Sequence, residues 1–335
     1  MMNCLITGGC GFIGRHFTKK MCELGYTVDV VDNMSSKSSL YQDKWIDRLK
    51  CSFNFFEEDT LEYLRKTKKK YHIIIHASAI VGGRETIEND PLLVSSNITT
   101  DNELFRWIEK NPTKYLVYFS SSAAYPIKLQ THESHRKLCL DDIDIKKNIC
   151  IPDLTYGWSK LTGEFLLDIL SKRVNTNISV YRPFSGYGED QHGSYPFPSI
   201  MKKVLSGKEE IEIWSDAVRD FVYIDDIVEY VLQTCFHNNK LVTRNIGSSI
   251  ATSMSELANT ISKVKFNRNV KINIVDNMPK GLYYRVSNDS ISNDSVSNDS
   301  ISNDSISNDS ISNDSIEYKL TSLEEGIRKS IPYFE

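Results

Sequence analysis

The stretch TGGCGFIG, residues 7–14, decides the fold, because it joins a short apolar run to an amphipathic segment at 12–24. Gly8 and Gly11 frame a tight turn that lets the backbone approach a pyrophosphate, and Gly14 permits close packing of a helix on a strand. The first N–H groups of such a helix point at an anion. The stretch therefore predicts a strand, a phosphate-binding turn and a helix in succession.

An acidic residue follows at the position that contacts the ribose of a bound nucleotide in this arrangement. Asp32 ends the next apolar run, 24 residues after Gly8. A carboxylate there accepts hydrogen bonds from both ribose hydroxyls and repels a 2′-phosphate. The glycine turn and this aspartate together predict that the chain binds NAD rather than NADP.

The rest of the first half alternates short apolar runs with longer amphipathic ones. The expected strands cover residues 4–6, 27–31, 51–56, 71–75 and 115–119, and the expected helices cover 12–24 and 91–107. This alternation predicts an α/β fold with a Rossmann-type doubly wound parallel sheet. We place this NAD-binding domain at residues 1–181. A smaller C-terminal α/β domain, mainly substrate-binding, is expected at 182–335, where the segments become shorter and less regular.

A low-complexity segment interrupts the second domain. Residues 287–316 hold six copies of the unit Ser-Asn-Asp-Ser-Ile, with Val296 replacing one isoleucine. One apolar residue in five buries too little surface to offset the entropy of ordering the chain. We expect a disordered loop over 287–316, followed by a helix that Ser322 caps.

Composition bounds the function classes. The 335 residues are 40% hydrophobic and 25% charged, with a formal net charge of −4, so no basic surface for nucleic acid or anionic membrane is indicated. No apolar run approaches the roughly 20 residues that span a bilayer. Seven cysteines, never spaced as CxxC, argue against a disulfide framework and a zinc site. We expect a cytoplasmic protein without a metal.

Two further motifs carry groups suited to acid–base chemistry. A serine run at 120–122 follows the strand expected at 115–119, and Tyr156 and Lys160 lie on one face of a later helix. An ammonium beside a phenol lowers the pKa of the phenol, so Tyr156 is predicted to act as a general base near neutral pH. A serine hydroxyl at the end of the strand is predicted to hold the substrate oxygen that exchanges the proton.

These motifs resemble the extended short-chain dehydrogenase/reductase family, specifically its NAD-dependent nucleotide-sugar epimerases and dehydratases of the UDP-glucose 4-epimerase type. The resemblance extends over nearly the whole chain. Besides the motifs above, it rests on the segments at 32–37, 76–79, 182–188, 219–226, 245–247 and 322–327, and on Asp59 and Asn97.

The resemblance implies a role for individual residues. NAD would lie with its adenine near Asp59, and Lys160 would also hold the nicotinamide ribose. A nucleotide-sugar substrate would direct its diphosphate toward Arg219 and Arg285. The implied cofactor-binding residues are Gly8, Gly11, Phe12, Ile13, Gly14, Asp32, Asn33, Ser36, Asp59, Thr60, Ala77, Ser78, Ala79, Asn97, Tyr156, Lys160 and Pro183. The implied substrate-binding residues are Gly82, Gly83, Arg84, Ala123, Ser185, Arg219 and Arg285.

Two serines are candidates for the catalytic hydroxyl beside Tyr156 and Lys160. The family's catalytic Ser or Thr usually lies four residues before the tyrosine that here is Tyr125, which selects Ser121. Taking the third serine of the run instead selects Ser122. We prefer Ser121, because the following Tyr-Pro pair resembles the branch of the family that acts on GDP-sugars, where that spacing holds.

The residues after the serine run favour the simplest reaction of the family. Its dehydratases and decarboxylases carry an Asp or Glu just after the catalytic Ser or Thr, whereas this chain has Ser122-Ala123-Ala124. Its 3,5-epimerases need a cysteine where Ala123 stands, and a second acid/base for which His192 is the candidate. We therefore expect C4 epimerisation through a transient 4-keto sugar, with bound NAD recycled.

Other activities remain as alternatives. They are a GDP-sugar 3,5-epimerase or epimerase/reductase, a sugar-nucleotide 4,6-dehydratase and, last, a non-catalytic NAD-binding protein. Ser185 stands where the family often has an asparagine at the diphosphate, and Val81 replaces a lysine of some epimerases. The nucleotide and the sugar therefore stay open at this point. The resemblance also implies a homodimer.

Overall fold

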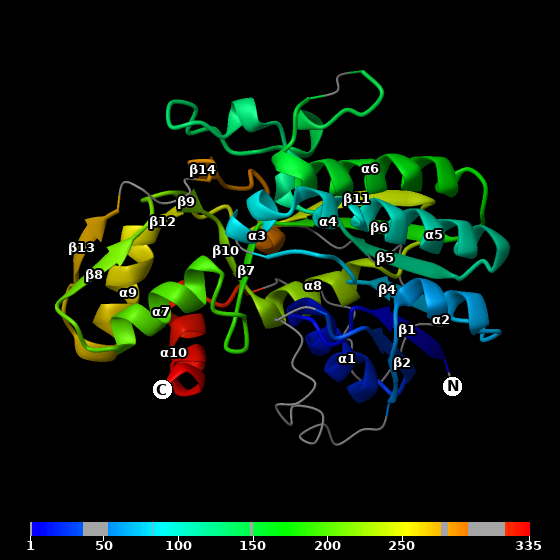
Figure 1. Ribbon diagram of the computed structural model, residues 1–335, viewed down its shortest axis with the longest axis horizontal. Helices are drawn as coiled ribbons and strands as arrows, with labels where there is room; N and C mark the ends of the chain where they lie inside the picture. The colour runs from blue at the N-terminus through cyan, green and yellow to red at the C-terminus, as the bar shows by residue number, and fades with distance from the viewer. Residues whose placement is uncertain (1, 36–52, 83, 148–149, 276–280, 294–318) are drawn as a thin grey trace.

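The computed structural model describes residues 2–35, 53–82, 84–147, 150–275, 281–293 and 319–335 (Figure 1). Its centre is a seven-stranded sheet in the order β11-β6-β5-β4-β1-β2-β3, in which every neighbouring pair is parallel. The strands are β1 (Asn3–Thr7), β2 (Thr27–Asp32), β3 (Asn54–Glu57), β4 (Ile73–His76), β5 (Tyr115–Phe119), β6 (Asn177–Pro183) and β11 (Leu241–Ile246). The predicted doubly wound parallel sheet is confirmed.

Helices cover both faces of this sheet, and its side chains divide between two cores. Cys4 and Ile6 of β1 pack on the side of α1 (Phe12–Glu23) and α8 (Ile224–Thr234). Leu5 between them packs on the opposite side, under helices from the first half of the chain. These helices are α2 (Thr60–Lys66), α5 (Asn97–Lys110) and α6 (Leu154–Ser171). Strands β4 and β5 are buried at every position, as expected for parallel strands between two helical layers.

The order of the strands reverses between β1 and β4. After β1 the chain continues outward to β2 and β3, and after β4 it continues the other way to β5 and β6. In open α/β sheets, ligands bind where the loops separate at such a switch point. The glycine motif follows β1 and the 77–80 loop follows β4, so both lie at this position.

The helix expected over 91–107 is two helices. α4 (Pro91–Ser95) ends and α5 begins around Ser96, whose carbonyl accepts from the N–H of Thr99 at 3.0 Å in a tighter turn. The preceding helix, α3 (Arg84–Asn89), is also short. In the described part of the chain, no helix combines the length and apolar character needed to cross a bilayer.

Residues after 182 build a second layer and also complete the first sheet. The small sheets are β7 (Ser185–Tyr187) with β10 (Phe221–Tyr223), β8 (Glu210–Ile213) with β13 (Lys271–Ile274), and β9 (Val218–Arg219) between β12 (Thr252–Ser253) and β14 (Tyr284–Arg285). Their helices are α7 (Pro196–Leu205), α9 (Met254–Phe266) and α10 (Leu323–Phe334). Ser322 caps α10 as predicted, since its hydroxyl accepts from the N–H of Glu325.

The first copy of the repeat is ordered, which corrects the expectation of a disordered loop over the whole of 287–316. The N–H of Ser287 donates to the carboxylate of Asp220 at 3.1 Å, and Ile291 is buried in the core beside α1 and α8. The N–H of Ile291 also donates to the carbonyl of Gly247 at 3.0 Å. One isoleucine and one serine suffice here because an existing core and carboxylate receive them. Copies beyond residue 293 lie outside the described residues.

Candidate active site

The glycine turn after β1 is too close to its neighbours for any side chain. Gly8 has a φ of +68°, in the left-handed region that favours glycine. A Cβ on Gly8 would lie 2.6 Å from the Cα of Ser78, and a Cβ on Gly14 would lie 2.1 Å from the carbonyl oxygen of Gly8. Gly11 closes the turn by donating its N–H to the same carbonyl at 3.1 Å. This bare backbone at a helix start fits the pyrophosphate of a dinucleotide.

Asp32 lies beside this turn at the end of β2. One carboxylate oxygen accepts from the N–H of Cys10 at 3.0 Å, and the other accepts from the N–H of Met34 at 2.9 Å. The first bond holds the carboxylate against the phosphate-binding loop, where the sequence places a ribose. The neighbouring Asn33 is exposed and accepts from the N–H of Ser35.

The loop after β4 forms the facing wall, and Asn97 fixes its shape. The side-chain oxygen of Asn97 accepts from the N–H of Ile80 at 2.7 Å, and its amide donates to the carbonyl of Ile80 at 2.9 Å. Ala77 donates its N–H to the carbonyl of Thr7 at 3.0 Å, which ties the loop to the end of β1. Since both the oxygen and the nitrogen of the Asn97 amide are bonded to the backbone of Ile80, Asn97 positions the 77–80 loop.

The structure brings Ser121 rather than Ser122 to Tyr156. The side chain of Ser121 lies close enough to that of Tyr156 to lower the pKa of the phenol, and the Ser121 hydroxyl accepts from the N–H of Ala123 at 3.0 Å. Ser122 begins the 3₁₀ turn η1 (Ser122–Ala124) and is buried within it. Both groups of the Ser121–Tyr156 pair are neutral hydroxyls at the carboxyl edge of the sheet, suited to passing a proton to or from one substrate oxygen.

The pKa of Tyr156 is raised in this structure, which contradicts the predicted net lowering beside Lys160. Burial raises the pKa of Tyr156, and Tyr195 raises it further, while Ser121 and the charge of Arg285 oppose them. The Lys160 ammonium lies 5.9 Å from the centre of the Tyr156 ring. Burial lowers the pKa of Lys160 itself, so desolvation dominates at both residues.

A buried network behind Lys160 escaped sequence analysis. Asp101 of α5 accepts from the hydroxyl of Tyr118 at 2.6 Å, and its other oxygen lies 2.9 Å from Nε2 of His76. The Lys160 ammonium lies 5.0 Å from the ring centre of Tyr118, and the Asp101 charge raises the pKa of Lys160 against the effect of burial. The partners of Asp101 are His76 on β4 and Tyr118 on β5, far from it in sequence. Near Asp101 itself, the sequence shows no more than an acidic residue within an amphipathic helix.

Two arginines of the predicted substrate set share one carboxylate. Arg84, at the start of α3, donates to one oxygen of Asp153 at 2.8 Å, and Arg285 in β14 donates to the other at 2.7 Å. The positive charges of Arg84 and Arg285 both lower the pKa of Arg219 in β9. Asp153 was not predicted, although it lies only three residues before Tyr156.

The other predicted residues have plain surroundings. Asp59 caps α2 by accepting from the N–H of Leu61 at 2.8 Å, and Thr60, the first residue of that helix, is buried. Ser185 donates its N–H to the carbonyl of Asp220 at 2.9 Å. The half-buried residues are Phe12, Ile13, Ser78, Ala79, Gly82 and Pro183, and Ala123 is buried. Ser36 and Gly83 lie outside the described residues.

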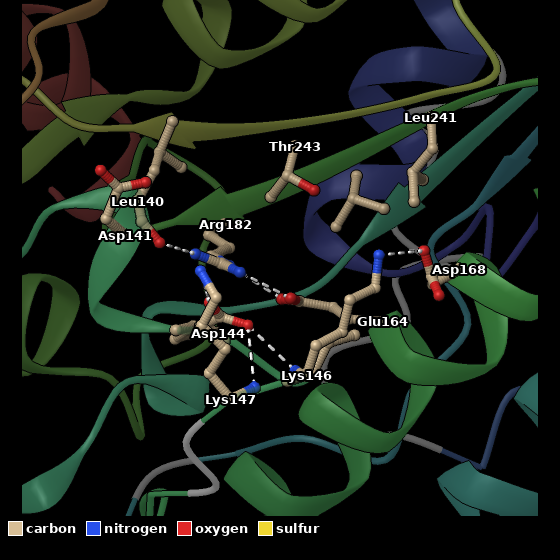
Figure 2. A pocket seen from close by; sticks show the side chains of 13 residues that line it. Leu140, Asp141, Asp144, Lys146, Lys147, Glu164, Asp168, Arg182, Leu241 and Thr243 are labelled. Atoms are coloured by element: carbon tan, nitrogen blue, oxygen red, sulfur yellow. Dashed lines mark hydrogen bonds and ion pairs between the residues drawn. The ribbon is translucent and has the colours of Figure 1, made fainter.

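A buried ion pair supports the serine run from behind. Glu164 of α6 accepts a hydrogen bond from the Ser120 hydroxyl and two from Arg182, at 2.9 and 2.7 Å. This pair reaches a cavity of about 680 Å³ between α6, the edge of the sheet and the 140–147 segment (Figure 2). The residues lining the cavity include none of the predicted cofactor or substrate residues. The cavity is therefore distinct from the candidate active site.

The fold and these loops define a class: a Rossmann-type enzyme whose dinucleotide cleft adjoins a Ser–Tyr–Lys group. The sequence model of the NAD dependent epimerase/dehydratase family matches residues 4–247. The chain belongs to this family, which works on nucleotide sugars as epimerases, dehydratases or reductases with NAD as the cofactor. The predicted family, fold and cofactor are thereby confirmed.

Individual relatives differ in activity. A UDP-glucuronate 4-epimerase of Thermodesulfobacterium geofontis is 31% identical over 234 residues, covering 67% of this chain and 68% of the relative. A dTDP-4-dehydro-6-deoxy-D-allose reductase of Streptomyces bikiniensis is 26% identical and covers 78% and 80%. Among solved structures, UDP-glucuronic acid 4-epimerase of Bacillus cereus, in complex with UDP-glucuronic acid and NAD, superposes with a TM-score of 0.77 at 22% identity over 99% of both chains.

Proposed function

We propose that the protein is an NAD-dependent nucleotide-sugar 4-epimerase. The observation that carries the proposal is the placement of Ser121 next to Tyr156, where it acts on the pKa of the phenol, together with the following Ser122-Ala123-Ala124. Two hydroxyl groups suffice to move one proton on and off a sugar oxygen. Elimination of water would need a further acid/base at the sugar, and the family's dehydratases take it from the segment that is alanine here.

The residues around the pair have distinct tasks in this reaction. Ser121 orients the sugar O4, and Tyr156 removes its proton and later returns it. NAD held between the glycine turn and Asp32 would supply the hydride acceptor for C4 and the donor for its return. Lys160, buried beside Tyr118 and Asp101, adds positive charge that favours the phenolate over the phenol. An oxidised nicotinamide bound there would add positive charge in the same sense, and with Lys160 it would counter the effect of burial on the pKa of Tyr156.

The alternatives differ in which hydrogens they exchange. A GDP-sugar 3,5-epimerase needs acid/base groups at C3 and C5, but Ala123 is a buried methyl group and His192 lies 2.9 Å from the hydroxyl of Ser194 in its own loop. A reductase consumes one reduced cofactor for each sugar, as its name implies for the Streptomyces relative. A 4-epimerase leaves the amount of reduced cofactor unchanged.

Product analysis tests the proposal. The purified protein is incubated with UDP-, GDP- and dTDP-sugars, and the products are separated by chromatography. We expect a nucleotide sugar with a neutral or an acidic hexose to be converted into its C4 epimer. In heavy water the product should carry no deuterium at C3 or C5, and the reaction should need no added cofactor. Tyr156→Phe should lose at least about a thousandfold in kcat, whereas Tyr333→Phe, at an exposed tyrosine of α10, should retain it. Deuterium uptake, loss of water or net oxidation of cofactor would refute a 4-epimerase.

We also propose that the enzyme is a homodimer paired through α6. Trp158, Phe165 and Ile169 are 41%, 48% and 40% exposed, and spacings of seven and four residues place them on one face of the helix. A row of large apolar side chains on a surface helix is typical of a protein interface. Light scattering should give twice the chain mass, and Phe165→Glu should give the chain mass. Ile250→Glu, at another exposed isoleucine, should leave the dimer intact.

A further inference from the structure

Three arginines from distant parts of the chain surround one aspartate. Arg84 and Arg285 donate to opposite oxygens of Asp153, at 2.8 and 2.7 Å. Arg219 donates to backbone carbonyls, among them that of Leu282 at 2.7 Å. Three positive charges thus share one mostly buried carboxylate; Glu88, which also accepts from Arg84, is more than a third exposed.

The charges in this group are not balanced. Burial lowers the pKa of Arg219 to about 9, and Arg285 and Arg84 lower it further in the same sense, while Asp153 alone raises it. Burial opposes the ionisation of Asp153, but Arg285 and Arg84 outweigh that effect and lower its pKa. Like charges in a partly desolvated site favour the binding of an anion that neutralises them.

Asp153 also connects this group to the catalytic pair. It immediately precedes α6, its N–H donates to the carbonyl of Ala123 at 2.9 Å, and its carbonyl accepts from the N–H of Gly157 at 2.8 Å. Its carboxylate therefore lies one helical turn from Tyr156 and beside the loop that holds Ser121. Arg84 belongs to the cofactor side of the cleft and Arg285 to the second layer.

We propose that Asp153 is an internal counter-ion that holds Arg84 and Arg285 in place of the substrate's diphosphate and releases at least one of them when the diphosphate binds. The inference rests on the proposed function only in that the ligand is a nucleoside diphosphate. The exchange moves a guanidinium from a carboxylate to a phosphate, two acceptors that match the same planar group of donors. Arg84 and Arg285 come from the two sides of the cleft and are joined through Asp153. Release of either arginine to the diphosphate would therefore separate the two sides.

The proposal predicts opposite effects of one substitution on the free and the bound protein. Asp153→Asn removes the competing negative charge, so UDP or GDP should bind about five- to tenfold more tightly. The same change leaves three arginines without a buried counter-charge, so the melting temperature of the protein without nucleotide should fall by about 5 °C. Saturating UDP or GDP should restore most of that loss. If Asp153 merely stabilised the fold, replacing it would not make the protein bind nucleotide more tightly.

Titration calorimetry and thermal unfolding with UDP and GDP test these effects. Asp153→Glu, which keeps the charge, should not tighten binding, and Arg84→Met should weaken it about tenfold. Asp168→Asn is the matched control on the same helix, where the carboxylate pairs with Lys146 and Lys172 beside the separate cavity of Figure 2; it should leave affinity unchanged. Weaker or unchanged binding by Asp153→Asn would overturn the inference, as would a wild-type protein that binds neither nucleotide. Binding as predicted without conversion of any sugar nucleotide would instead refute the 4-epimerase.

Discussion

The helix that begins in the glycine turn is tied to the second layer by a charged histidine. Nε2 of His16 lies 2.9 Å from one carboxylate oxygen of Asp190, and Nδ1 lies 3.7 Å from Asp225. Arg15, next to it, binds the other oxygen of Asp190. Burial alone would lower the pKa of His16, but the two carboxylates outweigh it and raise the pKa to about 9. His16 is therefore positively charged at neutral pH in the folded protein.

This shift predicts how stability changes with pH. The unfolded chain has a histidine pKa of about 6.5, so between about pH 6.5 and 9 the folded state binds one proton more than the unfolded state. The contribution of His16 to the free energy of unfolding is complete below about pH 6.5 and is lost as the pH rises through 9. At about 1.4 kcal/mol for each pH unit, the whole effect is about 3 kcal/mol, and the side chain is only 13% exposed.

Urea unfolding of the wild type and of His16→Gln at several pH values measures the effect. We expect His16→Gln to be less stable by about 3 kcal/mol at pH 6.5 and equal to the wild type near pH 9.5. Taking the difference between the two proteins removes the ionisation of other groups. A constant difference over this range would show that the His16 pKa is not raised and would refute the reasoning.

His237 provides the opposite case within the same chain. Burial and the charge of Arg244 lower its pKa to about 4, and its Nε2 lies 2.9 Å from the hydroxyl of Ser179. Here the unfolded state binds the extra proton between about pH 4 and 6.5, so stability rises with pH in that range. The stability of His237→Gln should therefore depend less on pH below 6.5 than that of the wild type.

Three further predictions concern the candidate site. Ser121→Ala should lower kcat about a hundredfold in the product assay, whereas Ser122→Ala should change it less than about threefold, because Ser121 acts on the Tyr156 phenol that we propose as the general base; the reverse order would select Ser122. Asp32→Ala should reduce the preference for NAD over NADP at least about tenfold in equilibrium binding, and an unchanged ratio would contradict its role at the ribose. Gly14→Ala should abolish NAD binding, because the new methyl group would lie 2.1 Å from the Gly8 carbonyl; retained binding would contradict the tight turn.

The parts of the fold that the sequence predicts are those that depend on neighbours along the chain. The Gly11–Gly8 bond of the glycine turn, the bond from the Met34 N–H to Asp32 and the Ser322 cap each join residues two or three positions apart. Buried parallel strands are also visible locally, because a strand covered on both faces is apolar throughout. The switch point follows from the order of these elements, so the cofactor side of the cleft could be predicted.

The substrate side depends on contacts between distant residues. Arg84 and Arg285 are 69 and 132 residues from the Asp153 that joins them, and nothing near Asp153 distinguishes it from a surface acid. The same holds for the first repeat copy, whose serine meets Asp220 across 67 residues. The effect of burial on the Tyr156 pKa also could not be predicted, because desolvation depends on everything packed around the phenol.

Two buried carboxylates near the cleft share one property that bears on the reaction. Asp153 binds two arginines, and Asp190 binds Arg15 and His16. The ion pairs lower the pKa of Asp153 and that of Asp190, the latter to about 2. A carboxylate held ionised by such partners is a poor proton donor at neutral pH. These acids thus join segments of the fold, while the neutral Ser121–Tyr156 pair remains for proton transfer, which favours reversible oxidation at C4 over the elimination of water.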